Sequence, residues 1–202
     1  MKRVVIIGAS GHGKVIADII QKTGDQVFGF LDDNESLGNS FCGFPILGTV
    51  DKSKEILDCE FVVGIGNAKI RDKIAKTVNG PFYTAIHPSA QISQIDVKIG
   101  EGTVVMANAV VNSGAKIGRH CIINSAAVIE HDDQISDYVH ISVGAKLAGS
   151  VCVGSNTWIG IGATISNNIS ICNDCMIGAG TVIVRNIMIS GTYVGIPAKR
   201  IK

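Results

Sequence analysis

Aliphatic residues recur at every sixth position through the C-terminal half of the chain. An α-helix repeats about every 3.6 residues and a strand alternates from one residue to the next, so neither element explains this period. A six-residue period instead indicates short strands and turns stacked into coils. The series comprises fifteen residues: Ile99, Val105, Val111, Ile117, Ile123, Ile129, Ile135, Ile141, Leu147, Val153, Ile159, Ile165, Ile171, Ile177 and Ile183. We therefore predict a solenoid whose core is the stack of these side chains.

Two other positions of the repeat agree with a solenoid. Small or slender residues occupy the fourth place after most of the aliphatics, and only Asp133 and Ile169 depart from that rule. Glycine often follows the aliphatic directly, where a chain that turns a corner needs positive φ or close backbone approach. Each hexad is therefore expected to be a short strand followed by a turn.

A different fold is expected for the N-terminal part. Apolar strands are predicted over residues 3–8, 27–31 and 61–63. Helical patterns follow the first and the third, the latter with Ile70, Ile74 and Val78 on its apolar face. Such alternation is typical of a parallel sheet, which binds nucleotides at the carboxyl ends of its strands. We expect a Rossmann-like α/β domain over residues 1–86 and an all-β solenoid domain over residues 87–202.

A glycine-rich turn joins the first predicted strand to the first helix. Such turns bring backbone N–H groups to a phosphate at a helix N-terminus. The spacing here is GxxGxG, from Gly8, Gly11 and Gly13, and differs from the dinucleotide fingerprint. A tight structural turn is the alternative. Asp32 and Asp33 end the second strand, where carboxylates accept hydrogen bonds from a ribose or base, and two solvated loop carboxylates are the alternative there.

Composition narrows the class of partner. The formal net charge of +1 at pH 7 gives no electrostatic argument for nucleic acid or a membrane surface. Residues 147–173 carry no charge, but their polar residues follow the six-residue repeat, so a solenoid explains them better than a membrane span. The six cysteines show no paired framework and the first residues show no signal peptide, which predicts free thiols in the cytoplasm.

Three N-terminal motifs and the hexads together carry a family resemblance. The segments GASGHGKV, LDD and GIGN, followed by the hexad domain, resemble the PglD/NeuD-type sugar acetyltransferases over essentially the whole chain. The resemblance implies a left-handed parallel β-helix with three hexads per coil, and homotrimers with active sites between adjacent β-helices. It implies direct N-acetylation of a nucleotide-activated amino sugar by acetyl-CoA, with no metal. The residues it implies in substrate binding are Ser10, Gly11, His12, Gly13, Asp32, Asp33, Gly64, Asn67 and Asn124.

His131, in the run Ile129-Glu130-His131-Asp132, is the candidate for the chemistry, and a solvated surface histidine is the alternative. It precedes Gly149 by 18 residues, one full coil, so a base and a backbone N–H would face one crevice. By the resemblance, His131 is the general base, Asp132 orients it, and Gly149 donates to the oxyanion. The residues implied in acetyl-CoA binding are His140, Gly149, Ile161, Ala179, Lys199 and Arg200, the last two of which also suit a solvated basic tail.

Other functions remain open from the sequence. A sugar O-acetyltransferase of the sialic-acid type would share the same base and cofactor. A γ-type carbonic anhydrase needs three histidines around zinc, and the separations of His120, His131 and His140 do not place them on one column. A non-catalytic nucleotide-sugar sensor would need only the glycine turn. Cys172 and Cys175 form a CxxC motif without a second one, so no zinc site is expected there.

Overall fold

The computed structural model describes residues 1–202 and divides the chain into two compact units, residues 1–88 and 89–202. The division falls after Pro88, close to the domain boundary expected after residue 86. Each unit has its own set of buried apolar side chains.

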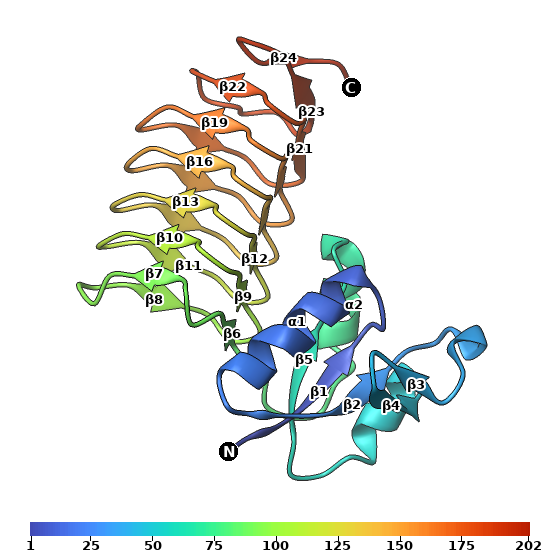
Figure 1. Ribbon diagram of the computed structural model, residues 1–202. Coiled ribbons are helices and arrows are strands. Elements are labelled where there is room, and N and C mark those ends of the chain that lie inside the picture. Colours follow the sequence, from blue (N-terminus) through green and yellow to red (C-terminus); the bar gives the residue numbers. More distant parts are fainter. The chain divides into compact units, whose positions relative to one another are not determined.

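The first unit is a five-stranded sheet with two α-helices (Figure 1). Its elements are β1 (Arg3–Ile7), α1 (Gly11–Lys22), β2 (Gln26–Leu31), the 3-10 helix η1 (Glu35–Leu37), β3 (Ser40–Phe41), β4 (Phe44–Gly48), the 3-10 helix η2 (Val50–Lys54), β5 (Glu60–Val63), α2 (Ala68–Ala75) and β6 (Ala85–Ile86). The strand order is β3-β4-β2-β1-β5, in which only β3 pairs antiparallel. Helix α1 packs against β1 and β2, and α2 packs against β5.

The β3–β4 hairpin has no counterpart among the predicted strands. Strand β3 has only two residues, and β4 contains Pro45 and ends at Gly48. Proline and glycine weaken a strand pattern, so this edge of the sheet carries little signal in the sequence. The three predicted strands correspond to β1, β2 and β5. A ligand is expected at the carboxyl ends of these strands.

The second unit is a β-solenoid of short parallel strands in three sheets (Figure 1). One sheet contains β7 (Gln91–Ile92), β10 (Val110–Val111), β13 (Val128–Ile129), β16 (Lys146–Leu147), β19 (Thr164–Ile165) and β22 (Val182–Ile183). Another contains β8 (Lys98–Ile99), β11 (Lys116–Ile117), β14 (Gln134–Ile135), β17 (Cys152–Val153) and β20 (Ser170–Ile171). The third runs through β9 (Val104–Val105), β12 (Ile122–Ile123), β15 (His140–Ile141), β18 (Trp158–Ile159), β21 (Cys175–Ile177), β23 (Gly191–Val194) and β24 (Lys199–Arg200).

The predicted aliphatic stack forms the core of the solenoid. From β8 to β22, paired residues of successive coils are 18 apart, as in Val128 opposite Lys146 and Lys146 opposite Thr164. Every aliphatic of the series from Val105 to Ile183 is buried. Ile99 is only half-buried, because β8 is the edge strand of its sheet and no strand pairs with its other side.

The uncharged stretch 147–173 lies within the solenoid, between β16 and the turn that follows β20. The two α-helices and two 3-10 helices are all too short, or too polar, to cross a bilayer. At the C-terminal end, β23 pairs antiparallel with β24 and so ends the run of parallel strands.

Candidate active site

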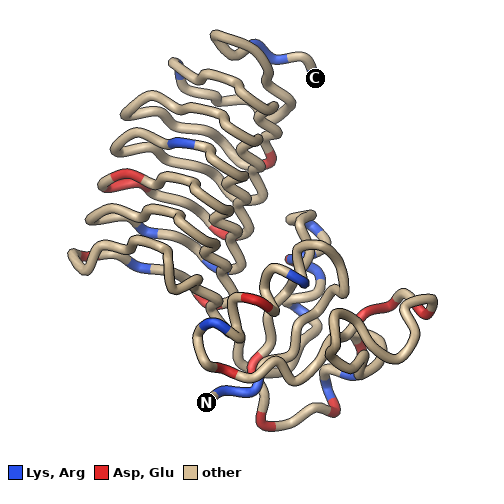
Figure 2. Tube along the Cα trace, viewed as in Figure 1, with Lys and Arg blue, Asp and Glu red and all other residues tan.

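The turn between β13 and β14 carries His131 on its exposed surface. His131 Nδ1 lies 2.9 Å from Asp132 Oδ2, and the His131 side chain is 59% exposed. The backbone N–H of Asp132 donates to Ser113 O of the preceding coil at 3.0 Å. Figure 2 shows this acidic turn in red at the end of β13. The pair therefore stands on a turn that the solenoid backbone holds in place.

Asp132 also sets the protonation of His131. Its hydrogen bond to Nδ1 raises the pKa of His131 above the ordinary histidine value, with smaller contributions in the same direction from the charges of Asp132, Glu130 and Asp133. Because Nδ1 is occupied by the carboxylate, Nε2 is the ring nitrogen left to exchange a proton with a ligand.

Two glycines make room for this pair. Gly149 lies one coil beyond His131, and a Cβ added to Gly149 would overlap His131 Nε2 and Cε1. Gly114 lies one coil before Asp132, and a Cβ added there would overlap Asp132 Oδ1. The structure thus brings His131 and Gly149 into direct contact. Gly114 was missed in the sequence, although its separation of 18 residues from Asp132 is a usable signal.

Asp133 lies beneath the same turn and is fully buried. Its Oδ1 accepts from the Val151 N–H at 2.7 Å, and its Oδ2 accepts from the Glu130 N–H at 3.0 Å. Burial raises the pKa of Asp133 to about 7, against the opposing effect of these two N–H groups. Asp133 was noted in the sequence only as an exception to the small-residue rule.

A second polar cluster occupies the sheet that contains β15 and β18. Asn124 Oδ1 accepts from the Ser125 N–H at 2.8 Å, so its Nδ2 points to His140 Nε2 at 3.1 Å. An amide NH₂ only donates, so His140 Nε2 is an acceptor here. The His140 ring stacks on Trp158 with centroids 4.8 Å apart, and Trp158 Nε1 donates to Ser142 Oγ at 2.6 Å. The 18-residue separation of His140 and Trp158 predicts that they are neighbours on successive coils, but the ring stacking and the hydrogen bond to Ser142 were not predicted.

The candidate residues of the solenoid fall at two different corners. His131 and Gly149 lie in turns that lead to β14 and β17, whereas Ile161 and Ala179 lie in turns that lead to β19 and β22. Ile161 and Ala179 are exposed and neighbour each other across coils, since the Gly180 N–H donates to Ile161 O at 2.8 Å. A single chain therefore does not place His131 beside Ile161 and Ala179.

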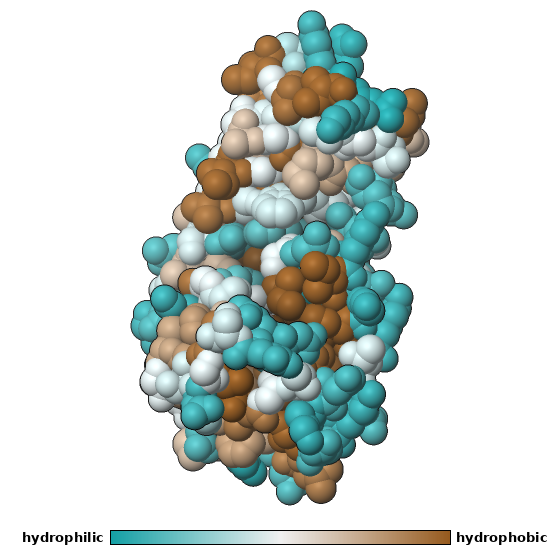
Figure 3. Space-filling view, turned by 90° about the vertical axis from the view of Figure 1, so that its right-hand side faces the viewer, coloured by the Kyte–Doolittle hydropathy of each residue, from teal (hydrophilic) through white to brown (hydrophobic).

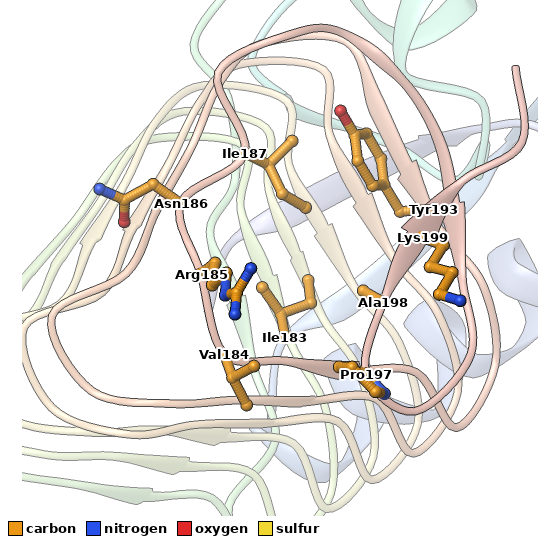
Figure 4. Close-up of a pocket in the computed structure, with 9 residues that line it drawn as sticks. All are labelled: Ile183, Val184, Arg185, Asn186, Ile187, Tyr193, Pro197, Ala198 and Lys199. Atoms are coloured by element: carbon orange, nitrogen blue, oxygen red, sulfur yellow. The ribbon is translucent and has the colours of Figure 1, made fainter.

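A cavity of about 370 Å³ opens at the C-terminal end of the solenoid (Figure 4). Lys199 and Arg185 both line it, together with Tyr193 and Pro197. Apolar patches interrupt the polar surface at this end of the molecule (Figure 3). Arg200 is exposed but is not among the lining residues. Arg185 was missed because it lies just beyond the last hexad, where the periodic signal ends.

In the first unit, the glycine turn combines packing with an open surface. A Cβ added to Gly13 would overlap Gly8 O, and one added to Gly64 would come 3.0 Å from Gly13 Cα. These glycines are therefore required for close backbone packing. Gly11 has open space around it. His12, next to it, is half-buried; desolvation, with the Arg71 charge, lowers the pKa of His12 to about 4, so it is neutral near pH 7.

Asp32, Asp33 and Asn67 are tied to the backbone. Asp32 accepts from the Ala9 N–H at 2.7 Å and the Asn34 N–H at 2.8 Å, and Asp33 Oδ1 accepts from the Val50 N–H at 2.9 Å. Asn67 Oδ1 caps α2 by accepting from the Ile70 N–H. The carboxylates are thus not simply solvated.

A cavity of about 160 Å³ adjoins these carboxylates. Asp32, Asp33, Gly8, Ile65 and Ile70 are among its lining residues. The cavity therefore combines apolar walls with carboxylates at the carboxyl ends of β1 and β2, which is the place expected for a ligand of a parallel sheet. Ser10 lies outside this lining, and its Oγ donates to Gly64 O at 3.3 Å.

The remaining cysteines and histidines were considered as metal ligands in the sequence. No three His, Cys, Asp or Glu side chains gather as a metal-binding group. Cys172 Sγ lies 3.5 Å from Cys175 Sγ. His120 is buried and stacks on Tyr138 with ring centroids 5.2 Å apart.

Comparison with known proteins places the chain in a family. Residues 3–78 match the family described as the PglD N-terminal domain, and residues 96–131 match the bacterial transferase hexapeptide family of six repeats. The acetyltransferase domain of PglB from Neisseria gonorrhoeae is 36% identical, and the match covers 100% of both chains with a TM-score of 0.94. The chain belongs to the PglD/NeuD-type sugar acetyltransferases.

Two further PglD/NeuD-type relatives carry the name of a sugar substrate. A histidine-to-asparagine mutant of perosamine N-acetyltransferase from Caulobacter crescentus, solved with CoA and GDP-perosamine, is 32% identical over 100% of this chain and 98% of that one, with a TM-score of 0.94. UDP-N-acetylbacillosamine N-acetyltransferase of Bacillus subtilis is 40% identical over 114 residues. That match covers 53% of this chain and 52% of the relative, so the chain spans about half the length of this curated relative.

Proposed function

We propose that the chain transfers the acetyl group of acetyl-CoA directly to the amine of a nucleotide-activated amino sugar. The observation that carries this proposal is the His131–Asp132 pair, held against Gly149 in an exposed turn. The acetyltransferase domain of PglB has also been solved in complex with acetyl coenzyme A, and this likeness supports the same acyl donor here.

In the proposed reaction His131 is the general base. The sugar amine attacks the thioester carbonyl and forms the C–N bond, while His131 Nε2 accepts the proton that the amine loses. The C–S bond then breaks, and CoA leaves as its thiolate and takes up a proton. Asp132 stabilises the imidazolium through Nδ1, and the Gly149 N–H is the proposed donor to the oxyanion.

The first unit is proposed to hold the nucleotide-linked sugar as a Rossmann-like domain, with the domain boundary at 86/87. The N-terminus of α1 offers backbone N–H groups around Gly11, where no side chain intrudes. Ser10, His12, Gly13, Gly64 and Asn67 surround that turn in sequence or in space, and the cavity lined by Asp32 and Asp33 suits the nucleoside. Asn124 is also proposed for substrate binding.

Acetyl-CoA is proposed to lie along the corner that carries Ile161 and Ala179, with His140 near the thioester and Lys199 and Arg200 near the phosphates. Since His131 lies at another corner, a cyclic trimer of left-handed β-helices would complete the site with residues of two subunits. Light scattering should therefore give three times the chain mass. A monomer at the concentration of the assay would contradict the shared site. A cytoplasmic location is proposed from the six cysteines, whose spacing shows no paired framework.

The test is a competition assay with acetyl-CoA and UDP-, GDP- and CMP-linked amino sugars. Release of the CoA thiol with one of them, and a product acetyl group that resists mild base, is the expected result. A base-labile product would instead show an ester and thus an O-acetyltransferase. Tight binding of a sugar nucleotide with no release of CoA would indicate a non-catalytic binding protein and would contradict the proposal.

Replacing Asp132 with Asn should move the pH profile of kcat/KM to lower pH. His131 must be neutral to act as a base, so activity falls as pH drops through its pKa, which Asp132 raises above the ordinary value. Loss of the carboxylate lowers that pKa, and the acid limb of the profile, where kcat/KM falls at low pH, shifts to lower pH with it. Asparagine tolerates the positive φ of 64° at this position, so the turn should persist.

Asp174→Asn is the matched control for this variant. Asp174 occupies the same phase of the repeat, has a φ of 56°, and donates its N–H to Ser155 O just as Asp132 donates to Ser113 O. Its substitution should leave the acid limb in place. An acid limb that does not move in Asp132→Asn would remove Asp132 from the control of His131.

A further inference from the structure

The backbone ladder of the solenoid is interrupted beside His131. In other coils the residue after the core aliphatic donates its N–H to the aliphatic carbonyl of the next coil, as Asn112 does to Ile129 O at 2.9 Å and Ala148 does to Ile165 O at 3.0 Å. Glu130 stands at this position but donates to Asp133 Oδ2 at 3.0 Å. The residue immediately before His131 is therefore held by a side chain.

The same carboxylate also reaches the next coil. Asp133 Oδ1 accepts from the Val151 N–H at 2.7 Å, two residues beyond Gly149. Asp133 thus joins the turn that carries His131 to the turn that carries Gly149. The carboxylate is 0% exposed, so both hydrogen bonds are shielded from competition with water.

Two threonines at the same phase of the repeat show what the scaffold alone requires. Thr103 Oγ1 accepts from the Cys121 N–H at 3.0 Å and donates to Gly118 O at 2.8 Å. Thr157 Oγ1 accepts from the Cys175 N–H at 3.2 Å and donates to Cys172 O at 3.1 Å. Each accepted N–H is 18 residues further on, as Val151 is from Asp133. Linking the coils therefore needs one acceptor, and the bond to Glu130 is additional.

We propose that Asp133 is a positioning residue, whose carboxylate clamps the turns of His131 and Gly149 together and so sets the imidazole against Gly149. Its effect on catalysis rests on the proposed function, in which His131 is the base. A carboxylate suits this role because it has two oxygens that accept in different directions. A hydroxyl at this position has one oxygen and can serve only one of the two N–H groups well.

Asp133→Thr separates the clamp from the link between coils. By analogy with Thr103, the new hydroxyl should accept from Val151 and donate to Ala148 O, while Glu130 loses its acceptor. We expect kcat to fall about tenfold to a hundredfold, because a small displacement of a catalytic group is that costly. KM for both substrates should change less than about threefold, since the threonine hydroxyl still holds the Gly149 turn through Val151 and the variant touches no other proposed binding residue. Thr103→Ala, the matched control, should lower the melting temperature and leave kcat unchanged.

A second readout does not depend on activity. The NMR signal of the His131 ring, assigned by its loss in His131→Ala, should shift in Asp133→Thr and stay in place in Thr103→Ala. If Asp133→Thr does not fold, Asp133→Asn, which keeps one acceptor oxygen and the side-chain shape, should show the same loss and shift. Wild-type kcat with an unmoved His131 signal would overturn the proposal. If the wild-type protein transfers no acetyl group, but the His131 signal still shifts in Asp133→Thr, the result would count against the proposed function alone.

Discussion

The His131→Ala variant is expected to lose about 10²- to 10⁴-fold in kcat, the usual worth of a positioned general base. The amine must lose a proton as its bond to the acetyl carbon forms, and no other ring nitrogen lies in this turn. Binding of the sugar nucleotide, measured by titration calorimetry, should be unchanged, because its proposed site lies in the first unit. Turnover close to that of the wild type would remove His131 from the mechanism.

His120 offers a matched control for this variant. Its ring also lies over a glycine, since a Cβ added to Gly102 would overlap His120 Nδ1 and Cε1. Unlike His131, it is 3% exposed and stacks on Tyr138. His120→Ala should therefore lower the melting temperature and spare turnover. Equal losses of turnover in the two variants would indicate a general disturbance of the solenoid instead of the loss of a base.

Gly149→Ala should lower kcat by about a hundredfold with little loss of stability, because a displacement of about 1 Å at a catalytic group has that cost. The nearest atoms to the added Cβ all belong to the His131 ring. This ring is the exposed end of a side chain, so it can swing away without disturbing the core. Melting temperature and kcat, measured on the same preparation, check both parts of this expectation.

The double variant His131→Ala, Gly149→Ala isolates the cause. Once the imidazole is absent, the added methyl group has nothing to displace, so Gly149→Ala should have little further effect on turnover. Losses that multiply in the double variant would mean that Gly149 acts independently of His131. In that case its backbone N–H, and the oxyanion it is proposed to bind, would become the main explanation.

The solenoid was predictable because the period of its sequence is the period of its structure. In each coil the side chain at the same position of the repeat must point inward. The spacing alone therefore predicts that Ile129, Leu147 and Ile165 are neighbours in successive coils. The first unit is less regular. Ile74 and Val78 pack against the buried cluster as expected, although Val78 lies beyond the end of α2, whereas Ile70 is 47% exposed and Arg71 is buried in its place at 1%. The guanidinium is tolerated inside because it donates to Ile65 O and Gly66 O at 2.9 and 2.8 Å.

The candidate site was predictable only as far as the period reaches. Spacing placed Gly149 beside His131, but it could not show that the ring rests on the glycine Cα, which depends on the rotamer. Nor could spacing show that the Glu130 N–H leaves the backbone ladder for Asp133. The sequence pattern is the same whether the Asp133 side chain points inward or outward. Trp158 on His140 is a contact between sheet neighbours whose stacking needs coordinates.

The 18-residue separation of paired positions makes the coil the unit in which this domain can change length. Loss of one residue between His131 and Gly149 would move every later aliphatic one place along its strand and turn the core outward. Loss of residues 150–167, one whole coil, would leave each remaining side chain in its former phase. A gene for such a protein can therefore gain or lose whole coils of 18 residues, while an insertion or deletion of any other length in the turn that carries the base would disrupt the core.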